Sequence, residues 1–153
     1  MLLFLALQAA TPAADALPPG IWARIGRSAA LRQDRLTLDM RSTYDGAAKR
    51  QEHHFRLERR RGGEPVVFLR ASSRTCPAVR EVASFSGLPM PEPQTPEDAL
   101  VIVMDGVGYS VTLPVGYAGQ ASGTVTLSSN TKTPLARWVD GALAKLERCW
   151  SPE

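Results

Sequence analysis

Residues 35–44, RLTLDMRSTY, decide the fold class because their side chains alternate between apolar and polar. Leu36, Leu38 and Met40 are separated by Thr37 and Asp39. Successive side chains of a β-strand point to opposite faces of a sheet, so a period of two indicates a strand with one buried face. The stretch therefore predicts a half-buried strand.

The next two apolar stretches predict two further strands. Residues 52–60 place Phe55 and Leu57 on one face, with charged residues on the other. The pair Gly62-Gly63 follows and is typical of a hairpin turn, after which residues 66–71 form the returning strand. We therefore expect these strands to be antiparallel neighbours, because two strands joined by a tight turn run in opposite directions.

Helical signals occur in three places. Pro77 suits the first position of a helix, and Gly87 would end that segment. The clearest element is 134–150, where the apolar side chains fall within about 140° of arc at about 100° per residue. Residues 21–33 carry a weaker helical pattern interrupted by a glycine, and we expect a short helix there too.

The remaining segments complete an α+β fold. Residues 89–96 contain four prolines, so we expect an extended connector without regular structure. Apolar or alternating residues predict strands at 99–104, at 109–113 and around Val125 and Leu127. The prediction is an antiparallel sheet of about six strands with amphipathic helices packed on one face.

The order of three strands and a helix would then occur twice, which suggests an internal duplication. Residues 72–77, which enter the first helix, resemble residues 128–134, which enter the last one, with one insertion. Helix entries use Ser, Thr and Pro without common ancestry, so the sequence leaves duplication and convergence both open.

The first sixteen residues are typical of a secretion signal. An apolar run covers Leu2 to Leu7, small residues follow, and Ala14-Asp15-Ala16 offers a cleavage site that puts the mature start near Leu17. No Lys or Arg precedes the apolar run, so either the signal is atypical or the true start lies upstream of Met1. We expect a periplasmic or secreted protein.

Length and composition predict one globular domain over residues 17–153. The chain has 153 residues, of which 44% are hydrophobic and 22% charged, as in ordinary globular domains. No stretch approaches the roughly 18 apolar residues that a membrane-spanning helix needs, so we expect no membrane span.

The two cysteines, Cys76 and Cys149, predict a disulfide bond. An even number of cysteines in an exported protein is most simply a pair. Closing this loop would stabilise the fold by about 4 kcal/mol in the chain-entropy model. The alternative is a reactive thiol at Cys76, because a helix amino terminus lowers a thiol pKa.

The positive charge is concentrated in one half of the chain. Residues 24–80 hold fourteen Lys or Arg against six acidic residues, whereas residues 81–153 hold four against eight. A predicted binding patch lies where a strand meets its turn, formed by Arg56, Arg59, Arg60 and Arg61. Such a patch would attract an acidic protein or an anionic envelope glycolipid.

The ordinary alternative for that patch is a solvated strand face that prevents edge-to-edge pairing. Nucleic acid is a disfavoured partner, because the chain is expected to be exported and aromatic residues are not interleaved with the basic ones. The oligomeric state has no signal in the sequence.

The sequence predicts no metal, no cofactor and no catalytic residue. His53 and His54 are the only histidines, and neighbours on a strand point to opposite faces. Zinc requires three or four converging ligands, which this pair does not supply. We expect His53 to be a half-buried sheet residue and His54 a surface residue.

Three functional hypotheses follow. The first is a non-enzymatic binding module of the cell envelope, comparable in build to a protein inhibitor, that uses the open face of its sheet. The second is a small hydrolase in which His53 or His54 acts with Ser122 or Asp105. The third is a purely structural envelope component.

Overall fold

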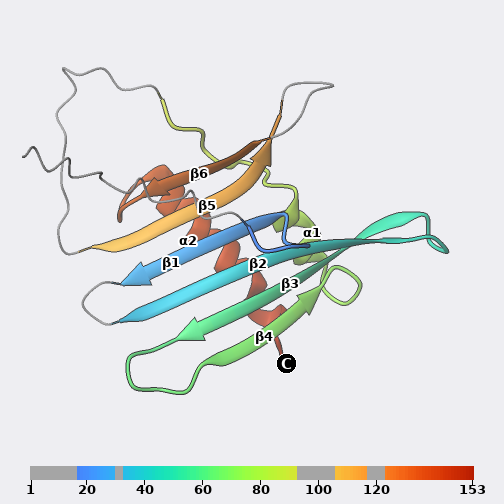
Figure 1. Ribbon diagram of the computed structural model, residues 1–153, viewed down its shortest axis with the longest axis horizontal. Helices are drawn as coiled ribbons and strands as arrows, with labels where there is room; N and C mark the ends of the chain where they lie inside the picture. Colours follow the sequence, from blue (N-terminus) through green and yellow to red (C-terminus); the bar gives the residue numbers. More distant parts are fainter. Residues whose placement is uncertain (1–16, 30–32, 93–105, 117–122) are drawn as a thin grey trace, which may run out of the picture.

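A computed structural model of the chain describes residues 17–29, 33–92, 106–116 and 123–153. Within these residues the chain forms one antiparallel sheet of seven strands, two α-helices and one 3-10 turn (Figure 1). The elements, in chain order, are β1 (Ala23–Ala29), β2 (Asp34–Asp45), β3 (Arg50–Arg60), β4 (Val67–Ser72), α1 (Pro77–Ala83), β5 (Val107–Val115), β6 (Gly123–Ser129), α2 (Pro134–Leu146), η1 (Glu147–Cys149) and β7 (Ser151–Pro152).

The strands lie in the order β6-β5-β1-β2-β3-β4-β7. Strands β1 to β4 form a continuous antiparallel meander, in which each strand pairs with the next. Strands β5 and β6 extend the sheet on the β1 side, and β7 adds two residues on the β4 side. The second half of the chain therefore supplies both ends of the sheet.

The prediction of a short helix over residues 21–33 is wrong, because this segment contains β1. Ala23 and Ile25 are fully buried, and Ile25 pairs with Leu38 of β2 on one side and Val111 of β5 on the other. Hydrogen bonding to two neighbouring strands and burial against both outweigh a weak local helical pattern.

The other described strands agree with the sequence. The strands predicted over 35–44, 52–60 and 66–71 are confirmed as β2, β3 and β4, and those at 109–113 and around Val125 and Leu127 as β5 and β6. The short β7 was not predicted. The strand predicted at 99–104 lies outside the described residues, as does part of the connector, of which residues 89–92 form neither helix nor strand.

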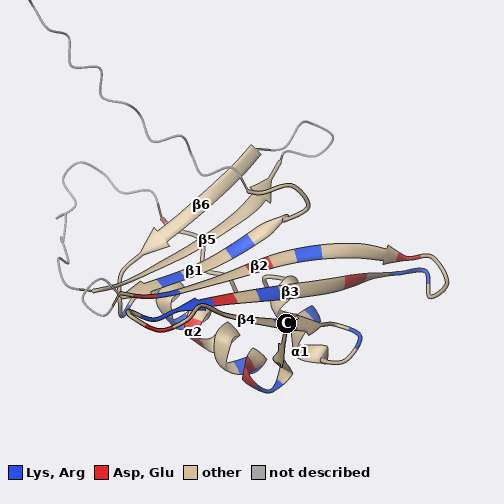
Figure 2. Cartoon of the chain, turned by 60° about the horizontal axis from the view of Figure 1, so that its bottom comes forward, with Lys and Arg blue, Asp and Glu red and all other residues tan. Residues whose placement is uncertain are grey.

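Both helices lie on the same side of the sheet (Figures 1 and 2). Thr133 caps α2, because its hydroxyl oxygen accepts a hydrogen bond from Ala136 N at 3.1 Å. The helix predicted over 134–150 ends at Leu146 and continues as η1. The largest fully buried side chains come from the sheet and both helices and are Phe55, Ile25, Leu38, Met40, Leu57, Leu146, Val79, Val111 and Val139.

The predicted pair Cys76–Cys149 is confirmed as a disulfide, with Cα atoms 5.7 Å apart. Cys76 is the residue that precedes α1, and Cys149 ends η1. The bond therefore fixes the end of the chain to the start of α1, next to the position where β7 pairs with β4.

The duplicated arrangement is not confirmed. Among the described elements, four strands precede α1 and two lie between α1 and α2, so the two halves differ in strand number. No helix within the described ranges is long and apolar enough to cross a membrane.

Candidate functional site

The face of the sheet opposite the two helices, called here the open face, is rich in arginine. Residues directly opposite each other in antiparallel strands share a face, and Arg24, Asp39, Arg56 and Arg70 form one such row across β1 to β4. Figure 2 shows basic positions along β1, β2 and β3. The arginines whose register places them on the open face are Arg24, Arg35, Arg41, Arg50, Arg56, Arg60 and Arg70.

Carboxylates balance this charge only in part. The acidic residues on the open face are Asp39, Asp45, Glu52 and Glu58, and Glu153 joins them from beyond β7. Seven arginines against five carboxylates leave two surplus positive charges. An antiparallel sheet can keep one face in water, so a charged open face is compatible with a core on the other side.

Specific ion pairs account for three of the seven arginines. Arg24 Nε is 2.6 Å from Asp39 Oδ1, and Arg60 pairs with Glu58. Arg56 pairs with Glu153.

The other four are Arg35, Arg41, Arg50 and Arg70, which are exposed. Within the described ranges, no carboxylate lies within ion-pair distance of any of them. They are the open-face arginines whose charge is available to an external anion.

Two of these exposed arginines line a hollow of about 660 Å³, named here the arginine hollow. It lies on the open face at the carboxyl-terminal end of β4, next to the two residues of β7. Its lining comprises Arg41, His54, Phe55, Arg56, Arg70, Ala71, Ser72, Thr75, Cys149, Ser151 and Glu153.

Arg56 is held firmly within the arginine hollow. Its Nε donates a hydrogen bond to Glu153 Oε2 at 2.7 Å, and its guanidinium carbon lies 4.1 Å from the centre of the Phe68 ring. The backbone N of Glu153 donates to Phe68 O at 3.2 Å. Both ends of the Arg56–Glu153 contact are thus anchored to β4.

The predicted binding patch does not lie on a single face. Arg56 and Arg60 have open-face register, whereas Arg59 pairs with residues of the helix-covered face and Arg61 lies beyond the end of β3. Arg61 Nη1 is 4.0 Å from Glu64 Oε2 across the turn. The binding role of the four arginines stays a prediction, but they form no continuous surface.

A second hollow, of about 620 Å³, lies on the open face over β1, β5 and β6. It forms because small residues, among them Gly26, Ser28, Gly108, Ser110 and Ser128, cluster there. A Cβ atom added to Gly26 would lie 2.5 Å from Ser110 Oγ, so a side chain at position 26 requires the serine to move. The hollow is uncharged except for the arginines at its rim.

The two histidines contact hydroxyl groups. His53 Nδ1 is 2.8 Å from Ser42 Oγ, and His54 Nε2 is 3.0 Å from Thr43 Oγ1. Burial, followed by the positive charge of Arg80, lowers the pKa of His53. His53 is half-buried as expected, and His54 is partly exposed on the open face.

Of the residues in the hydrolase hypothesis, the structure describes the two histidines. Their suggested partners, Ser122 and Asp105, lie outside the described residues. In the part of the chain that the structure describes, no carboxylate hydrogen-bonds either histidine. The same part contains no group of three or more His, Cys, Asp or Glu side chains placed to hold a metal ion.

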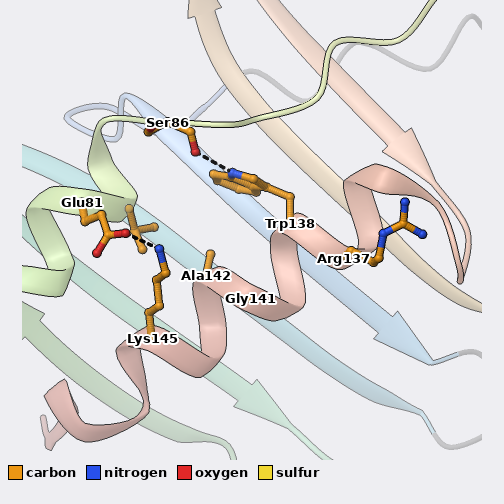
Figure 3. Close-up of a pocket in the computed structure, with 8 residues that line it drawn as sticks. Glu81, Ser86, Arg137, Trp138, Gly141, Ala142 and Lys145 are labelled. Carbon is orange, nitrogen blue, oxygen red and sulfur yellow. Dashed lines mark hydrogen bonds and ion pairs between the residues drawn. The ribbon is translucent and has the colours of Figure 1, made fainter.

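A smaller groove, of about 240 Å³, separates α1 from α2 (Figure 3). An ion pair between Glu81 and Lys145 crosses it, and Trp138 Nε1 donates to Ser86 O at 3.0 Å. The Trp138 ring stacks on Phe85, with ring centres 5.7 Å apart. These polar groups contact each other across the groove, so we interpret the groove as part of the packing between the two helices.

Comparison with protein-family models, curated proteins and solved structures finds no significant match.

Sequence reasoning missed three charged members of the arginine hollow, namely Arg41, Arg70 and Glu153. The first two occupy the polar positions of alternating strands, so the alternation could have assigned them to one face with Arg56. The position of Glu153 depends on β7, for which the sequence has no signal.

Proposed function

We propose that this protein is an exported, non-enzymatic binding module that holds an anionic envelope glycolipid against the open face of its sheet. The observation that supports it is the surplus of arginine on that face. Guanidinium groups stay charged at every physiological pH and bind phosphate oxygens in a bidentate manner, so a sheet that presents several of them is suited to an anionic surface.

The disulfide supports export. Disulfides form and persist in oxidising compartments such as the periplasm or the extracellular space. The bond between Cys76 and Cys149 thus agrees with the secretion signal expected at residues 1–16. An acidic protein would be attracted by the same charges, so the test below includes it as an outcome.

The test is vesicle co-sedimentation with the full chain. Phosphatidylglycerol, an anionic phospholipid, is the probe for the negative charge that the glycolipid would present. We expect binding to vesicles that contain it, no binding to pure phosphatidylcholine, and loss of binding at about 1 M salt, where the Debye length is about 3 Å. The double variant Arg35→Gln/Arg70→Gln should bind more weakly. The matched control is Arg137→Gln/Arg148→Gln, which removes two exposed arginines from the helix side.

Equal binding by the two double variants would contradict the proposal, because the open face would then have no special role. Binding that is insensitive to salt would contradict it as well. Failure to bind any vesicle, combined with salt-sensitive binding to polyglutamate that the open-face variant weakens, would replace the glycolipid with an acidic protein.

A small hydrolase is the second candidate, favoured by the 2.8 Å contact between Ser42 Oγ and His53 Nδ1. A serine hydroxyl beside a histidine with a lowered pKa has two of the groups that nucleophilic catalysis uses. Labelling by a fluorophosphonate that Ser42→Ala abolishes would support this candidate, and no labelling would exclude Ser42 as a nucleophile.

A further inference from the structure

The arrangement of arginines in the arginine hollow calls for an external anion. Arg56 and Arg70 are direct cross-strand partners, so their side chains leave the sheet next to each other. Arg41 is two residues from Asp39, the partner of Arg56 in β2, which puts it at the diagonal position about 7–8 Å away. Like charges at such positions repel, and an anion between them removes the repulsion.

The chain itself places an anion there. The carboxylate of Glu153 contacts Arg56 at 2.7 Å and lines the same hollow. It carries a single negative charge, whereas three of the lining residues are arginines. Within the described residues no carboxylate pairs with Arg41 or Arg70, so two positive charges are left over.

A phosphate monoester matches this surplus better than a carboxylate or a phosphodiester. It carries a charge of about −1.5 to −2 at neutral pH and three terminal oxygens that accept hydrogen bonds. A phosphodiester carries one charge. Three guanidinium groups supply donors in fixed planar forks, which suits a dianion with three equivalent oxygens.

The hollow is larger than a phosphate ion. Its volume of about 660 Å³ lies within the range of small-molecule sites, about 300–1,000 Å³. The polar side chains of His54, Ser72 and Thr75 line it together with the arginines. A phosphate attached to a sugar or to a lipid headgroup could therefore enter, with the hydroxyl groups in contact with these side chains.

We infer that the arginine hollow is a binding site for a phosphate monoester, in which the Glu153 carboxylate is an internal competitor that the ligand displaces from Arg56. The inference rests on the proposed function, because it selects one part of the open face and one class of headgroup.

The test measures binding of two probes by the full chain. Inorganic phosphate is titrated by NMR, and vesicles containing phosphatidic acid, a monoester, are compared with phosphatidylglycerol vesicles of equal surface charge. We expect amide shifts in β2, β3 and β4 and at Ser151 of β7, together with tighter binding to phosphatidic acid. Phosphate binding without that preference would assign free phosphate as the source, and it supports the same site.

Five variants locate the site. Arg41→Gln and Arg70→Gln should each weaken phosphate binding by about tenfold, which is the loss of one charge-assisted hydrogen bond. Arg35→Gln, on the same face but outside the hollow, should leave it unchanged. Glu153→Gln should tighten it, whereas Glu58→Gln, which removes the same charge from the same face outside the hollow, should not.

The two proposals fail in different ways. Equal effects of Arg35→Gln and Arg70→Gln, or of Glu153→Gln and Glu58→Gln, would overturn the site while leaving the open face as a diffuse anionic docking surface. An equal affinity for the two lipids with no phosphate binding would also overturn the site alone. Absence of salt-sensitive binding to any anionic probe would overturn both.

Discussion

Glu153 and Arg56 are 97 positions apart in the sequence, yet their side chains form a hydrogen bond of 2.7 Å. The contact occurs because β7 pairs with β4 and because Glu153 N donates to Phe68 O. The end of η1 is in turn fixed by the disulfide. The Cys76–Cys149 disulfide, on the helix side of the sheet, therefore helps to position the Glu153 carboxylate on the open face.

Glu153→Gln should change the free energy of unfolding by less than about 1 kcal/mol, because the two side chains are about 40% exposed and pairs in this environment contribute little. Urea denaturation measures it, with Glu64→Gln as a control that removes a similarly exposed partner of an arginine. A loss of several kcal/mol would mean that the pair maintains β7, and that Glu153 is too costly to displace.

Removing the disulfide should destabilise the protein much more. Cys76→Ala/Cys149→Ala should lower the free energy of unfolding by about 4 kcal/mol, because the unfolded chain regains the freedom of a 73-residue loop. Chemical denaturation compares the variant with the oxidised parent, and the parent reduced by dithiothreitol should match the variant. Equal stability of oxidised and reduced protein would contradict this expectation.

The stability should fall as the pH drops through the titration of His53. Burial lowers the pKa of the folded-state imidazole below the reference value of 6.5, so the unfolded chain binds a proton more readily. The stabilising contribution is complete above pH 6.5 and is lost as the pH falls through 6.5 and then through the lower folded-state pKa. An NMR titration of His53 Cε1–H measures that pKa directly.

His53→Gln should abolish this contribution. The free energy of unfolding of the variant should decrease less between pH 7.5 and pH 5 than that of the parent protein, because glutamine does not titrate. A folded-state pKa at or above 6.5, or an identical pH dependence in the variant, would contradict the role assigned to burial.

Tyr109→Phe should cost about 1–2 kcal/mol of stability. The Tyr109 hydroxyl donates to Asp140 Oδ2 at 2.9 Å, which joins β5 to α2, and the tyrosine is buried. A double-mutant cycle with Asp140→Asn separates this hydrogen bond from the nearby Arg27–Asp140 contact of 3.4 Å. A coupling energy near zero would show that the hydroxyl contributes through another contact.

Gly26→Ala should destabilise the sheet by about 1–2 kcal/mol, because the new methyl group would collide with Ser110 Oγ. Ser110→Ala removes that oxygen, and the nearest remaining side-chain atom, Ser110 Cβ, is 3.8 Å away, an ordinary contact. The double variant should therefore regain most of the loss in thermal unfolding. A single variant as stable as the parent would show that Ser110 rotates aside freely.

The alternation of apolar and polar residues was sufficient to predict most of the described strands, but it did not predict β1. In β2 every helix-side position from Leu36 to Met40 is apolar, so the period of two is plain. In β1 the series that begins with Ala23 and Ile25 continues with Arg27, whose guanidinium lies near Asp140 of α2. A charged residue at a helix-side position breaks the pattern, and only the tertiary structure shows its partner.

The site was harder to predict than the fold. Adjacent arginines in the sequence suggested a patch, but neighbours on a strand point to opposite faces, and the side chains that meet come from different strands. Arg41, Arg56 and Arg70 come together through the register of β2, β3 and β4. Register is set by pairing over the whole length of the strands, which residue patterns within one strand do not specify.

The position of the β1–β4 meander between β5 on one side and β7 on the other has a consequence for folding. A chain cut within residues 89–92 would leave β1 and β4 as unpaired edges, and such edges are templates for pairing with other molecules. Each flank also requires pairing across a long stretch of chain, as between Gly26 and Ser110, which slows folding. The protein should therefore unfold in one cooperative transition, and any half-chain fragment should aggregate.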